Sequence, residues 1–446
     1  MNRCLSDYYR CQEKHINLSL AGSLSKEAGY FQCGDHGLYY GQLCDGTPAP
    51  TPNNHLCDMT HRVRREHGVT YLPFDLAQVT DNLRLELYSN GSCHGASSFS
   101  SLLKDSYYLL RPLLPVSVRK HLQRARLSNW GTLKFPRWPV DRSVDQLFEQ
   151  ILLASLRAQG LMQIPFIWFW PNGAPGCAIM THDVETQVGR DHCSEVMDLE
   201  EGYGIKSCFA VVPEHRYEVT NQYLDSIRQR GFEVAVHDLN HDGHLFRERN
   251  EFLGRAKKIN AYGEQFGAKG FRAAALYRNQ GWFDVLKFSY DMSVPNVGHL
   301  EAQRGGCCTV MPYFVGDILE LPVTTVQDYA LFNYLNDYSI DLWKQQIELI
   351  LAQNGLINFI IHPDYITQPL ESGVFRSLLA HLAWLREHKG LWVTTPSEVD
   401  RWWRQRAKMS LVEKDGRMQI EGEGSEMARI AYASEEDGRL RFTIDA

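Results

Sequence analysis

Between about residues 165 and 405, the chain repeats one pattern that strongly restricts its fold: a short apolar run ends in polar or charged residues. One run ends in Thr181-His182-Asp183-Val184-Glu185, and another ends in His237-Asp238-Leu239-Asn240-His241. Three further runs end at Phe271-Arg272, Tyr290-Asp291 and Ile361-His362. The C-terminal ends of parallel strands converge in space, and α/β enzymes build their sites there. The pattern therefore predicts one site made from several strand ends.

Strand-like and helix-like segments alternate through the same part of the chain. The segments that read as strands are 177–181, 206–212, 232–236, 269–272, 287–290, 318–322, 357–361 and 391–394. Helical patterns lie between several of them, at 219–230, 245–267, 340–354 and 374–388. Such alternation indicates parallel strands joined by crossover helices. The number of repeats favours a closed or nearly closed barrel over an open sheet.

The rest of the chain has a different composition. Residues 1–100 are rich in Gly, Ser, Asn, Tyr and Cys, which favours a small, mostly β N-terminal domain. Residues 101–164 are interpreted as a helical connector, and residues 165–408 as the barrel. Short alternating stretches in 409–446 predict a small β appendage.

The charge distribution limits the possible partners. A net charge of −7 argues against nucleic-acid binding, which usually needs a clustered basic surface. The connector does hold a basic cluster, formed by Arg111, Arg119, Lys120, Arg124 and Arg126. A solvated helical face explains it, and weak contact with an anionic lipid or a diphosphate is the alternative. Further on, Asp141 can cap a helix that runs to about Gln159.

The N-terminal residues and the cysteines lead to an expected location. Residues 1–10 show no apolar core of a signal peptide, and no apolar run approaches the ~20 residues that span a bilayer. The eleven cysteines are an odd number, which favours reduced thiols in the cytoplasm. Cys33, Cys44 and Cys57 lack the CxxC pairs typical of structural zinc. We therefore expect a cytoplasmic protein without a membrane span, in which these are ordinary core cysteines.

Five residues at the ends of two runs can form a metal-dependent hydrolytic site. His237 and His241 are spaced so that both can chelate one ion, and His244 is an alternative ligand or lines the mouth. Asp183 and Glu185 alternate along an extended segment, so both point to the same side. One carboxylate could then bind the ion while the other stays free as a base.

In their order along the chain, these segments resemble the motifs of the polysaccharide deacetylases, carbohydrate esterase family four, also called the NodB-homology group. The matching segments are Thr181–Glu185, His237–His241, Gly270–Arg272, Tyr290–Asp291 and Ile360–His362. The resemblance covers about residues 165 to 400. It implies a distorted barrel, so the predicted fold class is α/β with a (β/α)7-type barrel, a mostly β N-terminal domain and a short β appendage.

The resemblance also implies one divalent metal ion, usually zinc. On that basis His237 and His241 are ligands. The family's common first motif has two adjacent aspartates, whereas position 184 is Val here, so we assign the carboxylate ligand to Glu185. Bound metal would lower the pKa of water from 15.7 to about 7 and polarise the acyl carbonyl.

The remaining catalytic roles follow from the same resemblance. Asp183 would be the general base and His362 the general acid. Arg272 would pair with Asp183 and keep it ionised, and Asp291 would orient His362. The family usually has a proline and an aromatic residue soon after the arginine, but Ala273-Ala274-Ala275 stand here, so the amide that would stabilise the oxyanion is not placed.

The predicted function is removal of an N- or O-linked acetyl group from a sugar or glycan precursor. Tyr277 and Tyr365 are the candidates for stacking on a sugar ring, with His244 beside them. The alternatives are a catalytically inactive carbohydrate-binding barrel and a hydrolase of a non-sugar amide. In the cytoplasm the substrate would be a sugar nucleotide, a lipid-linked intermediate or a small acetylated glycoside.

Overall fold

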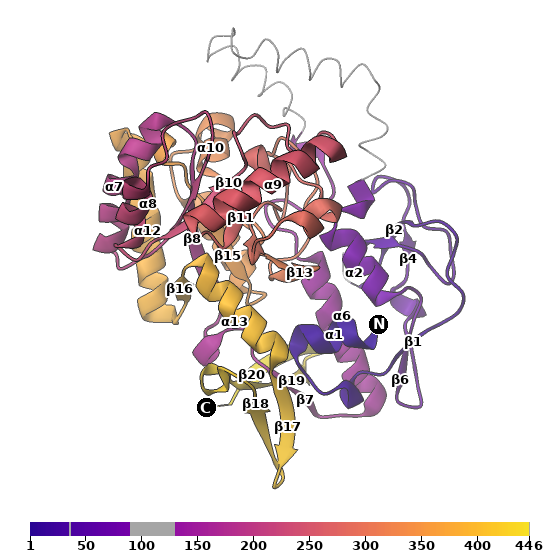
Figure 1. Ribbon diagram of the computed structural model, residues 1–446. Coiled ribbons are helices and arrows are strands. Elements are labelled where there is room, and N and C mark those ends of the chain that lie inside the picture. Colours follow the sequence, from indigo (N-terminus) through magenta and orange to yellow (C-terminus); the bar gives the residue numbers. More distant parts are fainter. Residues whose placement is uncertain (35–36, 90–129, 446) are drawn as a thin grey trace.

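A nine-stranded sheet forms the centre of the protein (Figure 1). The structure is a computed structural model that describes residues 1–34, 37–89 and 130–445. In spatial order the strands are β13 (Tyr313–Val315), β14 (Ile318–Glu320), β12 (Tyr290–Asp291), β11 (Gly270–Arg272), β10 (Glu233–His237), β9 (Cys208–Val211), β8 (Cys177–Val184) and β15 (Leu356–Ile360), with β16 (Trp392–Thr394) also paired to β8. Every pairing in this sheet is parallel except that of β13 with β14. The alternation of the sequence therefore gives the mixed α/β fold that it predicts.

The sheet curls until its two ends meet without pairing as strands. The segment that follows β14 contacts β15, although these strands stand far apart in the strand order. Thr324 Oγ1 donates to the carbonyl of Leu356 at 2.8 Å and accepts from the amide of Asn358 at 2.9 Å. Asn358 Nδ2 in turn donates to the carbonyl of Leu321 at 2.9 Å. Within the described residues no backbone ladder joins β14 to β15. Side-chain hydrogen bonds hold the seam, together with one backbone bond from the amide of Leu356 to the carbonyl of Val310 at 2.7 Å.

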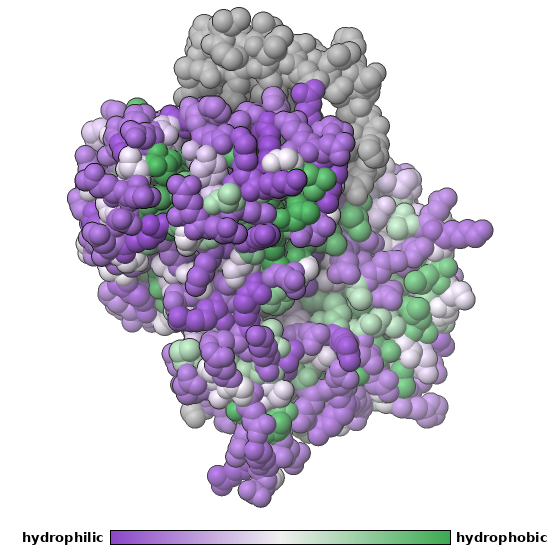
Figure 2. All heavy atoms as spheres, in the orientation of Figure 1, coloured by the Kyte–Doolittle hydropathy of each residue, from purple (hydrophilic) through white to green (hydrophobic). Residues whose placement is uncertain are grey.

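Helices pack around the curled sheet (Figure 1). They are α7 (Gln187–Gly202), α8 (Asn221–Arg228), α9 (Arg249–Phe266), α11 (Asp341–Leu351), α12 (Pro369–Lys389) and α13 (Pro396–Lys408). All residues of β8 are buried, as expected for a strand covered on both faces. In the orientation of Figure 1, polar side chains cover most of these helices, whereas apolar ones gather toward the N-terminal part (Figure 2).

The N-terminal part, which the sequence predicts to be mostly β, combines short strands with two α-helices. They are α1 (Asn2–Tyr9) and α2 (Leu76–Arg84), and two small sheets contain β1 (Leu18–Leu20), β6 (Val69–Leu72) and β5 (Arg64–Glu66), and β3 (Leu38–Gly41), β2 (Gly29–Gln32) and β4 (Cys57–Asp58). One hydrophobic core joins these elements to the central sheet, because Phe31, Phe148 and Ile179 belong to the same cluster of buried side chains.

The predicted connector helix is α6 (Ser143–Gln159). The N-cap position of this helix is Arg142, one residue after the predicted Asp141, but Asp141 Oδ1 still accepts from the amide of Ser143, the first helical residue, at 2.8 Å. The basic cluster at 111–126 lies outside the described residues.

The C-terminal residues form two hairpins. The first pairs β17 (Ser410–Lys414) with β18 (Arg417–Glu421), and the second pairs β19 (Ile430–Glu436) with β20 (Arg439–Ile444). On its other side β19 pairs with β7 (Gln163–Ile167), so a strand at the predicted boundary of the barrel joins the appendage.

Two sequence expectations concern membranes and cysteines. In the described part of the chain, no helix combines the length and apolar character needed to cross a membrane. The cysteines in that part are all free thiols, and most are buried.

Candidate active site

The ends of β8, β10 and β11 bring the predicted site residues together. Asp183 lies within β8 and Glu185 follows its last residue, while His237 ends β10 and Arg272 ends β11. These strands pair in parallel, and the register places His237 beside Arg272. His362 follows β15 at the same edge of the sheet. Convergence of the strand ends therefore accounts for the site.

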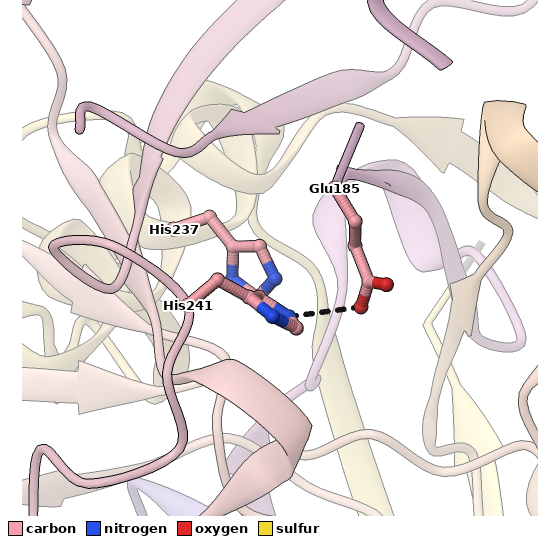
Figure 3. Close-up of side chains that lie close together, drawn as sticks. All are labelled: Glu185, His237 and His241. Atoms are coloured by element: carbon pink, nitrogen blue, oxygen red, sulfur yellow. Dashed lines mark ion pairs between the residues drawn. The ribbon is translucent and has the colours of Figure 1, made fainter. Parts of the chain in front are cut away.

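Glu185, His237 and His241 form a group of potential metal ligands (Figure 3). Their ligand atoms all lie within 4.8 Å of one another. Nε2 of His241 lies 2.9 Å from Oε1 of Glu185. Over residues 1–34, 37–89 and 130–445, no other group of His, Cys, Asp or Glu has this geometry, so Cys33, Cys44 and Cys57 do not form one.

The tautomer of His237 suits a metal ligand. Its Nδ1 lies 3.2 Å from the backbone oxygen of Arg272, which can only accept, so Nδ1 carries the proton. Nε2 is then a free lone pair, and it is buried without a hydrogen-bond partner among the described residues. Burial lowers the pKa of His237 to about 4, so the ring is neutral at physiological pH. A neutral imidazole held through its other nitrogen is the usual form of a metal-bound histidine.

His241 reaches the site because the loop after β10 turns back. Asp238 and His241 have positive φ angles of 57° and 56°, the left-handed region that His, Asn and Asp tolerate best among residues other than Gly. The rings of His237 and His241 consequently lie with centroids 4.8 Å apart. Arg216 Nη2 lies 3.1 Å from Nδ1 of His241. Ligation through Nε2 places a proton on Nδ1, so this exposed arginine must turn away when an ion binds.

Asp183 forms the expected ion pair with Arg272 through Oδ1, and its other oxygen, Oδ2, lies 3.8 Å from Nε2 of His237. Nη1 of Arg272 lies 2.9 Å from Oδ1 of Asp183 and also donates to Oγ1 of Thr181 at 2.8 Å. Burial raises the pKa of Asp183, but the Arg272 guanidinium and the nearby histidines lower it further, so the pKa lies below its ordinary value. Asp183 is therefore an ionised carboxylate, as a general base must be.

His362 is paired with Asp328, which the sequence interpretation did not identify. Nδ1 of His362 lies 2.6 Å from Oδ1 of Asp328, and the amide of His362 donates to Oδ2 at 2.7 Å. Asp328 begins the short helix α10 (Asp328–Ala330). Burial lowers the pKa of His362, but Asp328 and Glu185 raise it well above its ordinary value. The ring can therefore hold a proton on Nε2, which lies 3.6 Å from Oε1 of Glu185.

The predicted pairing of Asp291 with His362 is wrong. Asp291 accepts from the amide and from Oγ of Ser293, both at 2.9 Å. It also stands opposite Glu320 of β14, and burial raises the pKa of both carboxyls. Burial thus disfavours the ionised form of both carboxyls. Asp328 begins a short helix and lies outside the pattern of strand ends. The sequence pattern therefore did not indicate Asp328 as the partner of His362.

A cavity of about 150 Å³ opens over the site. Its lining includes Glu185, His241 and His362, together with Tyr277 and Tyr365, the two tyrosines that were expected to meet substrate. Other lining residues are Gly243, Ala274, Ala275, Leu300, Glu301, Ala302, Gln327, Tyr329, Ala330 and Tyr334, most of which sequence reasoning missed.

His244 does not join the ligand group. Its Nδ1 lies 3.9 Å from Oδ2 of Asp242, and the adjacent Gly243, not His244, is among the described residues that line the cavity. Among the described residues, His244 therefore neither belongs to the group of potential metal ligands nor lines the cavity.

Neither a family model nor a curated protein sequence matches this chain. Solved structures similar to part of it include a proposed polysaccharide deacetylase from Mycobacterium smegmatis, with 18% identity over 53% of this chain and 93% of that one, and a TM-score of 0.43. The PuuE allantoinase is 11% identical over 53% and 92%, with a TM-score of 0.42. The peptidoglycan deacetylase PdaC from Bacillus subtilis is 14% identical over 52% and 93%, with a TM-score of 0.32. At scores this low, we take the fold from the strand order and the chemistry from the site itself.

Proposed function

We propose that the protein is a metal-dependent hydrolase that removes an acetyl group from a sugar or a glycan precursor. The observation that carries the proposal is the separation of two neighbouring carboxylates. Glu185 belongs to a ligand group with two histidines, whereas Asp183 is turned to Arg272 and stays outside that group. Three protein ligands with an open position are typical of catalytic zinc sites.

A divalent ion bound by Glu185, His237 and His241 would supply acidity to water and polarise the acyl carbonyl. The free lone pair on His237 Nε2 and the neutral state of that ring support this assignment. Two imidazoles and one carboxylate are also a donor set that suits zinc.

Asp183 and His362 then perform the proton transfers. Asp183 accepts a proton from the attacking water, and its ion pair with Arg272 fixes the orientation of the carboxylate. His362 donates its Nε2 proton to the departing nitrogen or oxygen, while Asp328 holds Nδ1. An amine leaves poorly unless it is protonated, so this acid matters most for an amide substrate.

A sugar is the substrate class that the cavity supports. Four tyrosines line it, and aromatic rings of this kind stack on the apolar faces of sugars. The motif resemblance points to the same class. We further propose that the substrate is a precursor in a reducing compartment, because the chain is rich in cysteines without an evident pairing pattern.

The test is acetate release from a panel of N- and O-acetylated sugars by zinc-loaded protein, with a panel of acetylated non-sugar amines in parallel. Release from sugars alone is the expected result. Release from the non-sugar amides alone would favour the alternative hydrolase. Stoichiometric zinc without release from either panel would favour an inactive carbohydrate-binding barrel.

A further inference from the structure

Glu301 is a carboxylate in the cavity that the proposed mechanism does not use. It lines the same cavity as Glu185, His241 and His362. Oε2 of Glu301 accepts from Nε2 of Gln327 at 2.6 Å. Gln327 immediately precedes Asp328, the residue that holds the proposed general acid. The position of Glu301 is therefore fixed relative to the reacting groups.

The other acids at the site each have a cationic or imidazole partner. Asp183 pairs with Arg272, Asp328 with His362, and Glu185 with His241. For Glu301, no Lys, Arg or His nitrogen of the described residues lies within 4.0 Å of the carboxylate. Among the described residues, Glu301 is thus the acid of the cavity that has no direct counter-charge.

Arg278, whose charge acts on Glu301, is already committed to another acid. Arg278 Nε donates to Oε2 of Glu86 at 2.7 Å, and Arg278 Nη2 pairs with Oε1 of the same residue. Both side chains of this pair are buried. Arg278 also donates to the carbonyl of Leu276 at 2.8 Å. The positive charge of Arg278 therefore stabilises the carboxylate of Glu86 directly and acts on Glu301 only over a longer distance.

A half-buried carboxylate that accepts one hydrogen bond from the described residues, as Glu301 does from Gln327, gains from any further donor that a ligand brings to it. Burial raises the pKa of Glu301 above its ordinary value, and the hydrogen bond from Gln327 and the charge of Arg278 offset this rise only in part. A hydroxyl or an ammonium group would satisfy the carboxylate. A second anion in the same small cavity would meet like charge at short range.

We infer that Glu301 is a specificity-determining residue, which accepts a hydrogen bond from a hydroxyl or ammonium group of the substrate and rejects a substrate with a carboxylate or phosphate next to the acyl group. This inference rests on the proposed function. If Glu301 has this role, the acetylated sugars that the enzyme accepts are neutral sugars or amino sugars. A phosphate of a nucleotide or lipid carrier would have to lie outside the cavity.

The test compares three sugars with the same N-acetyl group: a neutral methyl glycoside, its uronic acid, and a disaccharide in which the second sugar carries a free ammonium group. We expect wild-type kcat/KM to be on the order of 10–100-fold lower for the uronic acid than for the neutral sugar. In Glu301→Gln this ratio should shrink toward one, because the charge is lost while the size is kept. Glu413→Gln removes the same charge from an exposed strand far along the chain and should leave the ratio unchanged.

Equal kcat/KM for the neutral and anionic sugars in the wild type would overturn the inference, and so would a ratio that Glu301→Gln leaves intact. If no sugar releases acetate, the proposed function fails, and calorimetric Kd values for the same sugars on zinc-loaded wild type still test Glu301. A Kd ratio near one would then overturn the inference, whereas weaker binding of the uronic acid would support it. Circular dichroism and zinc content show whether Glu301→Gln is folded.

Discussion

At the residue scale, the two carboxylates that follow one another at the end of β8 have different partners. Asp183 faces Arg272, and Glu185 faces His241 and His362. Alternation along an extended strand predicts that both point to the same side, but it cannot assign their partners. That assignment depends on which strand end lies beside each carboxylate, and the sequence does not contain the strand register.

The first prediction separates the two roles. Asp183→Asn should retain zinc and lose turnover by about 10²–10⁴-fold, because an amide cannot accept the proton. Glu185→Gln should instead lose zinc affinity. Elemental analysis after dialysis, together with acetate release, measures both effects. Loss of zinc in Asp183→Asn with full zinc in Glu185→Gln would show that the roles are exchanged.

The second prediction concerns the pH dependence of kcat/KM. Activity needs an ionised Asp183, whose pKa is lowered, and a protonated His362, whose pKa is raised well above its ordinary value. The rate should therefore persist as pH rises past the ordinary histidine range and fall only as pH passes the raised pKa of His362. Asp328→Asn removes the anion that raises this pKa, so the alkaline fall should move to lower pH.

The control for that profile is Asp341→Asn, which removes an acid from the exposed start of α11. Its profile should match the wild type. An alkaline fall that stays in place in Asp328→Asn would mean that Asp328 does not set the protonation of His362.

At the scale of elements, strong apolar runs were predictable and weakly patterned segments were not. The runs that became β8, β10 and β15 were placed within a few residues, because buried parallel strands are continuously apolar. α7 was missed, since its buried face includes Gly189 and Glu200 and so breaks the apolar stripe. β13 was also missed, since three residues give no measurable period.

The third prediction tests the seam of the curled sheet. Thr324→Val keeps the shape of the side chain but leaves the carbonyl of Leu356 and the amide of Asn358 without a partner. We expect a loss of about 1–3 kcal/mol in the free energy of unfolding, measured by urea denaturation. Thr443→Val, at an exposed position of β20, should change it by less than about 0.5 kcal/mol. Equal effects of the two substitutions would contradict a seam made by Thr324.

At the scale of the whole molecule, the N-terminal part reaches the rim of the site through one buried ion pair. Glu86 lies just after α2, in the N-terminal part, and forms an ion pair with Arg278. Arg278 directly follows Tyr277, which lines the cavity. Glu86 also accepts from the amide of Gly306 at 2.6 Å. This link could not be predicted from the sequence, because the two residues are 192 positions apart and neither belongs to a motif.

The fourth prediction is a double-mutant cycle on this pair. Glu86→Ala leaves a buried, uncompensated arginine and should cost about 3–5 kcal/mol in the free energy of unfolding. Adding Arg278→Met should restore much of the lost free energy of unfolding, since the buried arginine charge without a partner is then removed. Additive losses in the double variant would show that the two side chains do not act as a pair.

The central claim is that Glu185, His237 and His241 hold one ion on which turnover depends. The most direct measurement is the rate of acetate release from an N-acetylated sugar as zinc is added back to chelator-stripped protein. We predict no release without zinc, and a rate that rises to a plateau at one ion per chain. Full release by the stripped protein, or an unchanged titration in His237→Ala, would contradict the claim.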